Sequence, residues 1–415
     1  MKGHRFAGFG FGPIQAGLFA AEAFKSGRFQ RIVIAEVDQK LVDAIRSNNG
    51  SYHVNVASSS GILTERIDGI EIYNPAVDFD RRTLLDALSQ ATEIVTSLPS
   101  VNFYDKGEHS VASLIARGLK NSTAKATVVY TAENNNHAAE ILHEKVVLQQ
   151  GELKHPVQFL NTVIGKMSQV VTDKAEIAEK NLTPIAPGID RAFLVEEFNR
   201  MFVTRCHLQD FKPGIETFIE KQDLLPFEEA KLYGHNAIHA LLAYLGAEKG
   251  YPKMAELEND AEIMRIAHDA FIQESGAALI RKYAALSDAL FTEAGFKDYA
   301  EDLLKRMTNP YLGDPVERAA RDPQRKLGLK DRIFGTMALC LEQGVEPKNM
   351  ALGAAAGIAY YIQQTGLAQH ISFKEALEQL WQNENSRYKS QLLEEMEKAY
   401  GRLPLQGASR RRLPG

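Results

Sequence analysis

The sequence predicts an α/β domain with a parallel sheet, followed by an all-α domain. Over the first half, short β-rich runs such as RFAGFG, RIVIAEV and ATVVYTAEN alternate with helical stretches, a rhythm typical of a parallel sheet with helices on both faces. From about residue 225 the chain changes to long helical stretches, broken at NPYLGDP and EQGVEPKN. A length of 415 residues also favours two domains. We therefore predict an α/β domain at 1–205, a helical domain at 206–400 and a flexible tail at 401–415.

The composition is that of an ordinary globular protein: 45% of residues are hydrophobic and 24% are charged. A net charge of −5 argues against nucleic acid or an anionic membrane as the main partner. The N-terminal stretch lacks the apolar core of a signal peptide, and no apolar run is long enough to span a membrane. Two distant cysteines fit a reducing compartment. We expect a cytoplasmic monomer or homodimer that acts on a small molecule.

The first predicted strand runs into a glycine-rich turn, GFGFGPIQAG. Gly10 and Gly12 take the first two positions of the G-x-G-x-x-G pattern. The first glycine allows a tight turn, and the second lets the backbone approach a pyrophosphate at a helix N-terminus. Gln15 stands at the third position, where a glycine normally allows close packing of helix on strand.

An acidic residue, Glu36, ends the next predicted strand, RIVIAEV. A carboxylate at this point can hold the hydroxyls of an adenosine ribose and repel a 2′-phosphate. NAD is therefore favoured as cofactor, while Lys40 nearby leaves NADP open. The predicted cofactor-binding residues are Gly10, Phe11, Gly12, Pro13, Ile14 and Glu36.

A polar stripe marks the helical stretch KLYGHNAIHALLAYLG at 231–246. At about 100° per residue, Lys231, His235 and His239 fall within roughly 80° of one another, and Asn236 lies at roughly 140° from Lys231. Asn and His are poorer helix formers than the Glu, Lys and Arg usual on solvated faces. The stretch alone fits either a solvated face or a set of reactive groups that faces a cleft.

Taken together, these segments resemble the polyol-specific long-chain dehydrogenase/reductase family, and within it the mannitol-1-phosphate 5-dehydrogenase branch. The glycine turn, AEVDQ, SYHVNV, TAEN, the 231–246 helix and NPYLGDPVERAARDPQRKLGLKDR follow in the family's order. The most specific element is Lys231-x4-Asn236-x2-His239, which matches the family's catalytic signature. One departure is Gln15-Ala16, where this branch carries a third glycine followed by arginine.

The resemblance implies a Rossmann-type dinucleotide-binding domain, a helical substrate and catalytic domain, and metal-free hydride transfer between NAD and a secondary alcohol or ketone. It gives Lys231 the role of acid and base, and Asn236 and Asn134 the role of donors to the developing oxyanion. His239 would orient a substrate hydroxyl. The family supplies no role for His235, for which packing or a surface position is expected. His235 and His239 have the spacing of a helical zinc pair, but no H-E-x-x-H pattern or third ligand accompanies them, so no metal is predicted.

Basic residues follow in VERAARDPQRKL. By resemblance, Arg318 and Lys326 face the polyol chain, whereas a solvated loop with surface ion pairs is the alternative reading of these residues. Arg321 and Arg325 add positive charge nearby, which is compatible with a phosphate or carboxylate on the substrate.

The predicted function is therefore an NAD-dependent oxidoreductase that interconverts a polyol, such as the hexitol phosphate mannitol 1-phosphate, and the corresponding ketose. Alternatives within the family are reductases of fructuronate or tagaturonate and dehydrogenases of unphosphorylated polyols of the mannitol type. The β-hydroxyacid dehydrogenases also use Lys and Asn on a helix, but with a shorter separation. A non-catalytic NAD-binding sensor would not need the set Lys231, Asn236 and His239.

Overall fold

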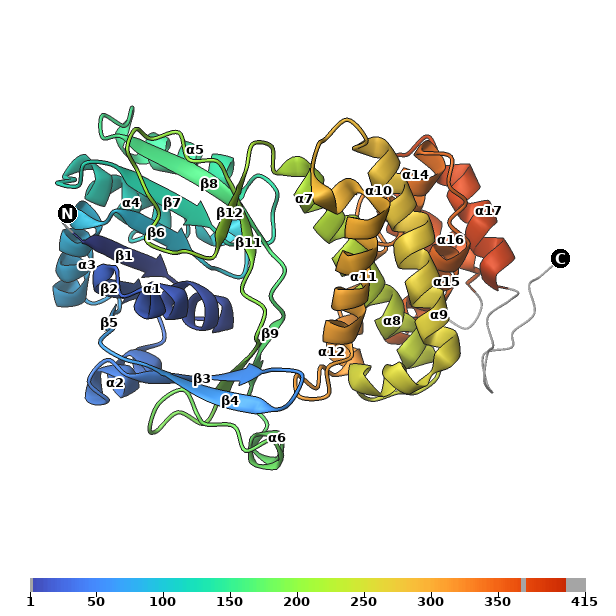
Figure 1. The fold of residues 1–415 in the computed structure, drawn as a ribbon, viewed down its shortest axis with the longest axis horizontal. Coiled ribbons are helices and arrows are strands. Elements are labelled where there is room, and N and C mark those ends of the chain that lie inside the picture. Colours follow the sequence, from blue (N-terminus) through green and yellow to red (C-terminus); the bar gives the residue numbers. More distant parts are fainter. Residues whose placement is uncertain (1–2, 367–370, 401–415) are drawn as a thin grey trace. The chain divides into compact units, whose positions relative to one another are not determined.

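The computed structural model describes residues 3–366 and 371–400, and the chain divides into two compact units, Met1–Leu225 and Pro226–Gly415. The first unit contains two sheets with helices on their faces, and the second unit is helical (Figure 1). The fold class predicted from the sequence is confirmed. The tail predicted to be flexible, 401–415, lies outside the described residues.

The main sheet of the first unit has the strand order β12-β11-β8-β7-β6-β1-β2-β5. The six strands from β5 to β8 are parallel, and their order along the chain is 3-2-1-4-5-6, the doubly wound arrangement of dinucleotide-binding domains. β11 adds an antiparallel strand beside β8, and β12 pairs with β11 in parallel. The strands are β1 (His4–Phe9), β2 (Phe29–Ala35), β5 (Glu71–Tyr73), β6 (Glu93–Thr96), β7 (Thr127–Thr131), β8 (Val157–Ile164), β11 (Met201–Thr204) and β12 (Phe218–Lys221).

Two apolar clusters bury the two faces of this sheet. Along β2, Ile32 and Ile34 point to one cluster, and Val33 points to the other. Because β2 is covered on both sides, its buried half, IVIA at 32–35, is continuously apolar and does not alternate with polar residues. The helices of this unit are η1 (Gln15–Ala20), α1 (Ala21–Ser26), α2 (Gln39–Ser47), α3 (Asp78–Gln90), η2 (Val101–Phe103), α4 (Val111–Lys120), α5 (Ala138–Gln150) and α6 (Lys174–Glu179). η1, α1 and α2 cover one face, and α3, α4 and α5 cover the other.

A second, four-stranded sheet has the order β4-β3-β10-β9 and was not predicted from the sequence. It pairs β3 (Tyr52–Ala57) with β10 (Ala192–Glu196). Because these strands are far apart along the chain, no local sequence pattern predicts their pairing. β4 (Ile62–Ile67) and β9 (Ser168–Val171) complete it. The Tyr52 hydroxyl donates to the Ala16 carbonyl at 2.8 Å, which ties this sheet to the helix that follows the glycine turn.

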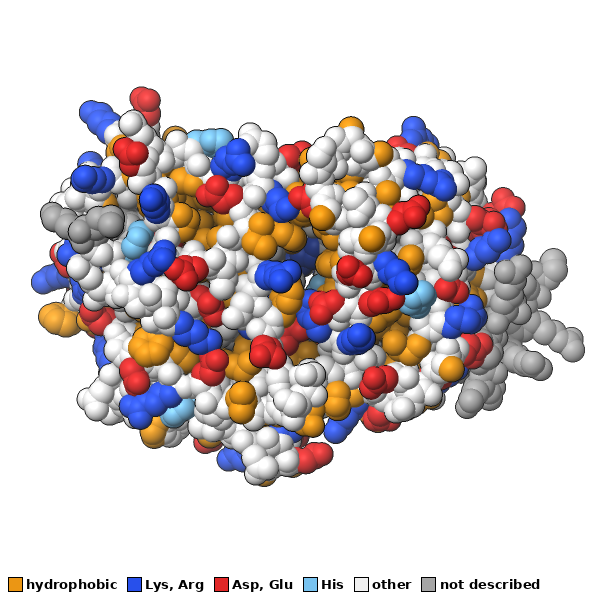
Figure 2. Space-filling view, viewed as in Figure 1, with side chains coloured by type: hydrophobic (Ala, Val, Ile, Leu, Met, Phe, Trp, Pro, Cys, Tyr) orange, Lys and Arg blue, Asp and Glu red, His pale blue; other side chains and the backbone are white. Residues whose placement is uncertain are grey.

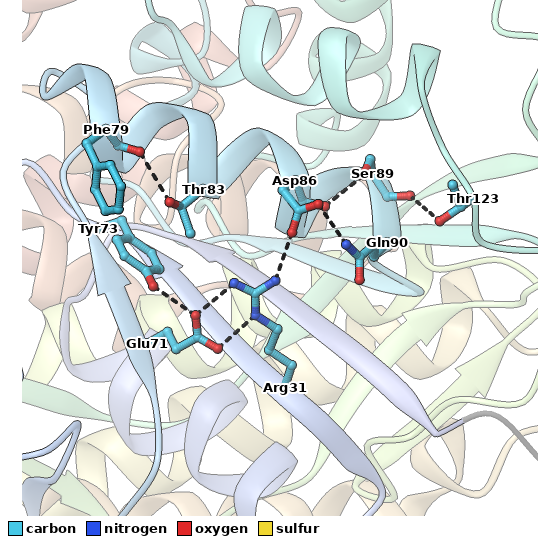
Figure 3. A network of polar contacts seen from close by, with 9 residues as sticks. All are labelled: Arg31, Glu71, Tyr73, Phe79, Thr83, Asp86, Ser89, Gln90 and Thr123. Atoms are coloured by element: carbon cyan, nitrogen blue, oxygen red, sulfur yellow. Dashed lines mark hydrogen bonds and ion pairs between the residues drawn. The ribbon is translucent and has the colours of Figure 1, made fainter.

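A polar network fixes the outer edge of the main sheet (Figure 3). The Arg31 guanidinium of β2 binds both oxygens of Glu71 on β5, at 2.7 and 2.8 Å, and Asp86 on α3 at 3.2 Å. Tyr73 donates to the same Glu71 carboxylate. Arg31 lies in the first half of β2, whereas ligands of doubly wound sheets bind beyond the carboxyl ends of the strands. The network therefore anchors α3 and β5 and is not part of the site.

The second unit is built of helices around the buried run α8. α15 carries the small-residue sequence LGAAAGIA, and a Cβ added at Gly353 would come within 2.8 Å of Leu241 on α8. The two helices therefore pack closely because these positions lack side chains. The helices are α7 (Leu225–Glu229), η3 (Ala230–Asn236), α8 (Ala237–Glu248), η4 (Met254–Asn259), α9 (Ala261–Asp269), η5 (Ala270–Gly276), α10 (Ala277–Lys282), η6 (Ala289–Phe291), α11 (Glu293–Met307), α12 (Val316–Ala320), α13 (Pro323–Lys326), α14 (Phe334–Glu342), α15 (Lys348–Thr365), α16 (Phe373–Leu380) and α17 (Lys389–Tyr400).

Charges of both signs are mixed over the molecular face in view (Figure 2), so no single-sign surface appears there. Among residues 3–366 and 371–400, no helix is both long and apolar enough to span a membrane.

Candidate active site

The glycine turn has the backbone geometry that its sequence predicts. Gly10 follows β1 with φ +80°, and its N–H donates to the Ala35 carbonyl at 2.9 Å. A Cβ at Gly10 would lie 2.7 Å from the Ser97 carbonyl oxygen, so a side chain is excluded both by the backbone conformation and by the neighbouring loop. Gly12 borders open space, so a ligand can approach the protein backbone there. Pro13 and Ile14 form the first helical turn, in which proline is favoured because its missing N–H has no helical acceptor.

Glu36 is bound to the glycine turn. Its Oε2 accepts the Phe11 N–H at 2.7 Å, and its Oε1 accepts the N–H groups of Val37 and Asp38 at 2.7 and 2.8 Å. A carboxylate offers about two acceptor positions on each oxygen. One position, on Oε2, is therefore left for a ribose hydroxyl. Glu36 thus joins the ends of β1 and β2 and still presents a negative charge at the edge where a cofactor ribose would lie.

Gln15, at the third glycine position, is fully buried. Its side chain lies over β1 at Gly8, where an added Cβ would be only 1.8 Å from the Gln15 Nε2. In the usual pattern a glycine on the helix lets helix and strand pack closely. Here the glycine is on the strand, at Gly8, and it makes room for the Gln15 side chain of η1. Neither amide atom of Gln15 has a hydrogen-bond partner among the described residues.

Asn134 follows β7, and the neighbouring Glu133 fixes its loop. Glu133 is buried and accepts hydrogen bonds from the Leu98 N–H at 2.9 Å, the Thr96 hydroxyl at 2.9 Å and the Tyr104 hydroxyl. Burial raises the pKa of Glu133, although these three donors oppose the rise. The loops after β6 and β7 are thereby joined, and the exposed Asn134 stands at the carboxyl edge of the sheet.

Lys231, Asn236 and His239 lie on one continuous helical run in the second unit, from α7 through η3 to α8. The run is not a regular α-helix: Ala230–Asn236 is a π-helix. Lys231 is half-buried, and burial, with a further contribution from the Arg332 guanidinium, lowers the pKa of Lys231 to about 8. The charge of Glu228 opposes this change in pKa. The amine can therefore gain or lose a proton close to neutral pH.

His239 is hydrogen-bonded to the buried carboxylate of Asp314. The His239 Nε2 lies 3.2 Å from Asp314 Oδ2, and the Arg318 Nε donates to Asp314 Oδ1 at 2.6 Å. The Asp314 side chain is 2% exposed. Burial opposes its ionisation, but His239 and Arg318 outweigh burial and lower the pKa of Asp314 to about 2. A charged Asp314 thus holds two of the predicted substrate-facing groups in fixed positions.

Lys326 lies near several arginines. Its side chain is buried, with 5% of the residue exposed, and its Nζ donates to the Ala319 carbonyl. Burial, followed by the charges of Arg332, Arg325 and Arg321, lowers the pKa of Lys326 to about 7. Arg325 pairs with Asp322 and Asp331, and Arg332 with Asp331.

His235 faces the interior, and burial lowers the pKa of His235 well below its ordinary value. Of the two roles expected for His235, packing and a surface position, its burial agrees with packing. Within the described residues, no group of three or more His, Cys, Asp or Glu side chains is arranged to hold a metal ion.

The predicted site residues thus form two groups. The cofactor residues and Asn134 lie at the carboxyl edge of the main sheet, and the others lie in the second unit. Sequence reasoning missed Asp314, Arg332 and Glu133. Asp314 had a readable signal, because it precedes Arg318 by four residues, a common ion-pair spacing.

Comparison with known proteins agrees with this description. Residues 223–404 match the family of the mannitol dehydrogenase C-terminal domain. A mannitol-1-phosphate 5-dehydrogenase of Caldanaerobacter subterraneus subsp. tengcongensis is 29% identical over 94% of this chain and 96% of its own length. Another, from Exiguobacterium sibiricum, is 27% identical over 88% of this chain and 91% of its own.

Two solved structures share the fold. A D-sorbitol dehydrogenase in substrate-free form aligns with a TM-score of 0.75 at 14% identity, over 96% of this chain and 93% of the other. The ternary complex of Pseudomonas fluorescens mannitol 2-dehydrogenase with NAD and D-mannitol aligns with a TM-score of 0.72 at 17% identity, over 96% and 92%.

Proposed function

We propose that this chain, which matches the mannitol dehydrogenase C-terminal domain at 223–404 and resembles mannitol-1-phosphate 5-dehydrogenases over most of its length, interconverts a phosphorylated hexitol, such as mannitol 1-phosphate, and the corresponding ketose phosphate. The chain is an NAD-dependent oxidoreductase that acts on the CH–OH group of a polyol. Phosphate on the substrate, Lys231 as the acid and base, and the absence of a metal from the reaction are the further parts of the proposal. The α/β domain predicted at 1–205 is proposed to bind the dinucleotide, and the helical domain predicted at 206–400 to bind the substrate. The first unit of the structure extends to Leu225, because β12 joins the main sheet.

The observation that carries the proposal is the environment of Lys231. Alcohol oxidation needs a base for the hydroxyl proton, and ketone reduction needs an acid for the new alkoxide. An amine with a pKa of about 8 can do both near neutral pH. Asn236 lies five residues further along the same helical run and can donate its amide N–H to the developing oxyanion. A lysine exposed on a solvated face would not have its pKa lowered by burial.

The cofactor fits the first unit. Gly10 and Gly12 open the approach to the start of η1, where backbone N–H groups can bind a pyrophosphate, and Glu36 offers an acceptor to a ribose hydroxyl. When bound, the nicotinamide accepts or returns the hydride. The residues of this chain hold the cofactor, orient the polyol and move the hydroxyl proton.

The cations around Lys326 support a phosphorylated substrate. Arg332, Arg325 and Arg321 lie close enough to Lys326 to lower the pKa of its amine. An amine with a pKa of about 7 is only partly charged at neutral pH, and a nearby dianion would favour its protonated form. A phosphate bound here would therefore favour the protonated form of Lys326, whereas a neutral sugar would not.

The test measures NADH consumption with fructose 6-phosphate, fructose, fructuronate and tagaturonate. We expect fructose 6-phosphate to give the highest kcat/KM. Equal efficiency with fructose would support an unphosphorylated polyol, and preference for a uronate would support the reductase alternative. No turnover with any of them, combined with tight NAD binding, would support a sensor.

A further inference from the structure

The helix that carries Lys231 and Asn236 contains a π-turn, and this changes which of its side chains share a face. In a regular α-helix, residues five apart lie roughly 140° from each other. In a π-helix the hydrogen bonds run from residue i to residue i+5, so residues five apart lie one above the other. Lys231 and Asn236 are five apart and both lie within the π-helix Ala230–Asn236. The π-turn therefore brings the amine and the amide to one side of the run.

Two buried hydroxyls hold this segment from neighbouring helices. Ser275 donates to the Tyr233 carbonyl, in the middle of η3, at 2.7 Å. Thr336 on α14 shares its one hydroxyl proton between the Arg332 carbonyl at 2.5 Å, just before its own helix, and the same Tyr233 carbonyl at 3.2 Å. Both hydroxyl residues are fully buried. A π-turn interrupts the regular ladder of backbone bonds, so a carbonyl within it needs donors from elsewhere.

Aromatic rings of the neighbouring segments pack closely against the π-turn. A Cβ at Gly234 would lie 3.0 Å from the ring of Phe271, and a Cβ at Gly335 would lie 2.9 Å from the ring of Tyr233. Phe271 belongs to η5, another π-helix, Ala270–Gly276, which also carries Ser275. Two π-helical segments thus contact each other where the hydroxyl of one binds the carbonyl of the other.

We propose that Ser275 and Thr336 are positioning residues, which hold the π-turn and thereby place Lys231 and Asn236 around the same reacting oxygen. This inference rests on the proposed function, because it assumes that both side chains serve the reaction. If the segment became α-helical, Lys231 would turn by about 100° relative to α8, and a side-chain tip roughly 5–6 Å from the axis would move about 8 Å. Misplacement by about 1 Å is enough to cost about 10²-fold in rate.

The test compares Ser275→Ala, Thr336→Val and their combination with Thr336→Ser, which keeps the hydroxyl and removes only a methyl group. We expect the combination to lower kcat by about 10²-fold, as for a misplaced reacting group, with an unchanged KM for NAD. Thr336→Ser should retain the wild-type kcat. A crystal structure of the combined variant should show 230–236 with i→i+4 bonds. Should the combination fail to fold, each single substitution carries the test with a smaller loss of kcat.

A folded combined variant with wild-type kcat would overturn the inference, and so would a loss of kcat while the π-turn persists. Lys231→Ala, measured in parallel, separates this result from the proposed function. If Lys231→Ala is inactive and the hydroxyl variants are fully active, only the positioning role fails. If Lys231→Ala remains active, the proposed function fails whatever the hydroxyl variants do.

Discussion

Replacement of Asp314 by asparagine removes one charge from the second unit and keeps the shape of the side chain. In the folded protein the pKa of Asp314 is about 2, against an ordinary value of 3.8. A tenfold change in an acid dissociation constant corresponds to about 1.4 kcal/mol, so the ionised form stabilises the fold by about 2 kcal/mol at neutral pH. Because folding lowers this pKa, the contribution is fully present above about pH 4 and is lost as the pH falls towards 2. Asp314→Asn should therefore cost about 2 kcal/mol at pH 7.

The single tryptophan of the chain lies in the same unit as Asp314, so it can report this loss of stability. Trp381 is fully buried in the second unit and donates to the Leu327 carbonyl at 2.8 Å. Its fluorescence during urea denaturation reports the unfolding of that unit. We also expect a higher KM for the polyol, because the asparagine amide keeps only one acceptor oxygen for His239 and Arg318, while the KM for NAD stays the same. Wild-type stability and wild-type KM for the polyol in Asp314→Asn would refute the reasoning.

Three further predictions concern the two units separately. Glu36→Ala should raise the KM for NAD and narrow the preference for NAD over NADP, because the Phe11 N–H loses its acceptor and the ribose loses its carboxylate partner. Steady-state kinetics with both cofactors checks this prediction. A wild-type protein that prefers NADP would contradict the assignment of Glu36. Gly8→Ala should destabilise the first unit by about 1–3 kcal/mol, the usual cost of overpacking. Adding Gln15→Gly should recover part of this loss in thermal unfolding, because the new methyl group would still lie 2.7 Å from Ile34 Cδ1 and glycine weakens the helix. An unaffected single variant would contradict the packing account. Arg318→Ala and Lys326→Ala should mainly raise the KM for fructose 6-phosphate; a fall in kcat alone would argue against substrate binding by these residues.

The sequence was sufficient where the signal is local. The βαβ rhythm, the glycine turn and the apolar helices each follow from short-range periodicity and turn chemistry, and the fold class follows from them. The second sheet was missed because β3 and β10 are separated by more than a hundred residues. The π-turn was missed because a polar stripe read at a constant 100° per residue contains no sign of an inserted residue. That error placed Asn236 away from Lys231, although the family signature includes both.

Site chemistry was predictable only in part for a related reason. Residue types indicated an amine and an amide as reagents, but not what surrounds them. The lowered pKa of Lys231 depends on burial and on Arg332, a residue about a hundred positions away. The role of Gln15 depends on a glycine in the preceding strand. Such effects belong to tertiary packing, and a single sequence does not display them.

The central claim is that Lys231 exchanges the proton of the reacting hydroxyl. The most direct measurement is kcat for alcohol oxidation and for ketone reduction across pH 6–10 in the wild-type protein and in Lys231→Ala. For the wild type, oxidation should rise through a pKa of about 8, as the amine loses its proton, and reduction should fall through the same value. Lys231→Ala should lower kcat in both directions by about 10²–10⁴-fold and abolish this dependence on pH. If Lys231→Ala keeps more than about a tenth of wild-type turnover, well above the loss expected for a general acid–base group, the claim is wrong.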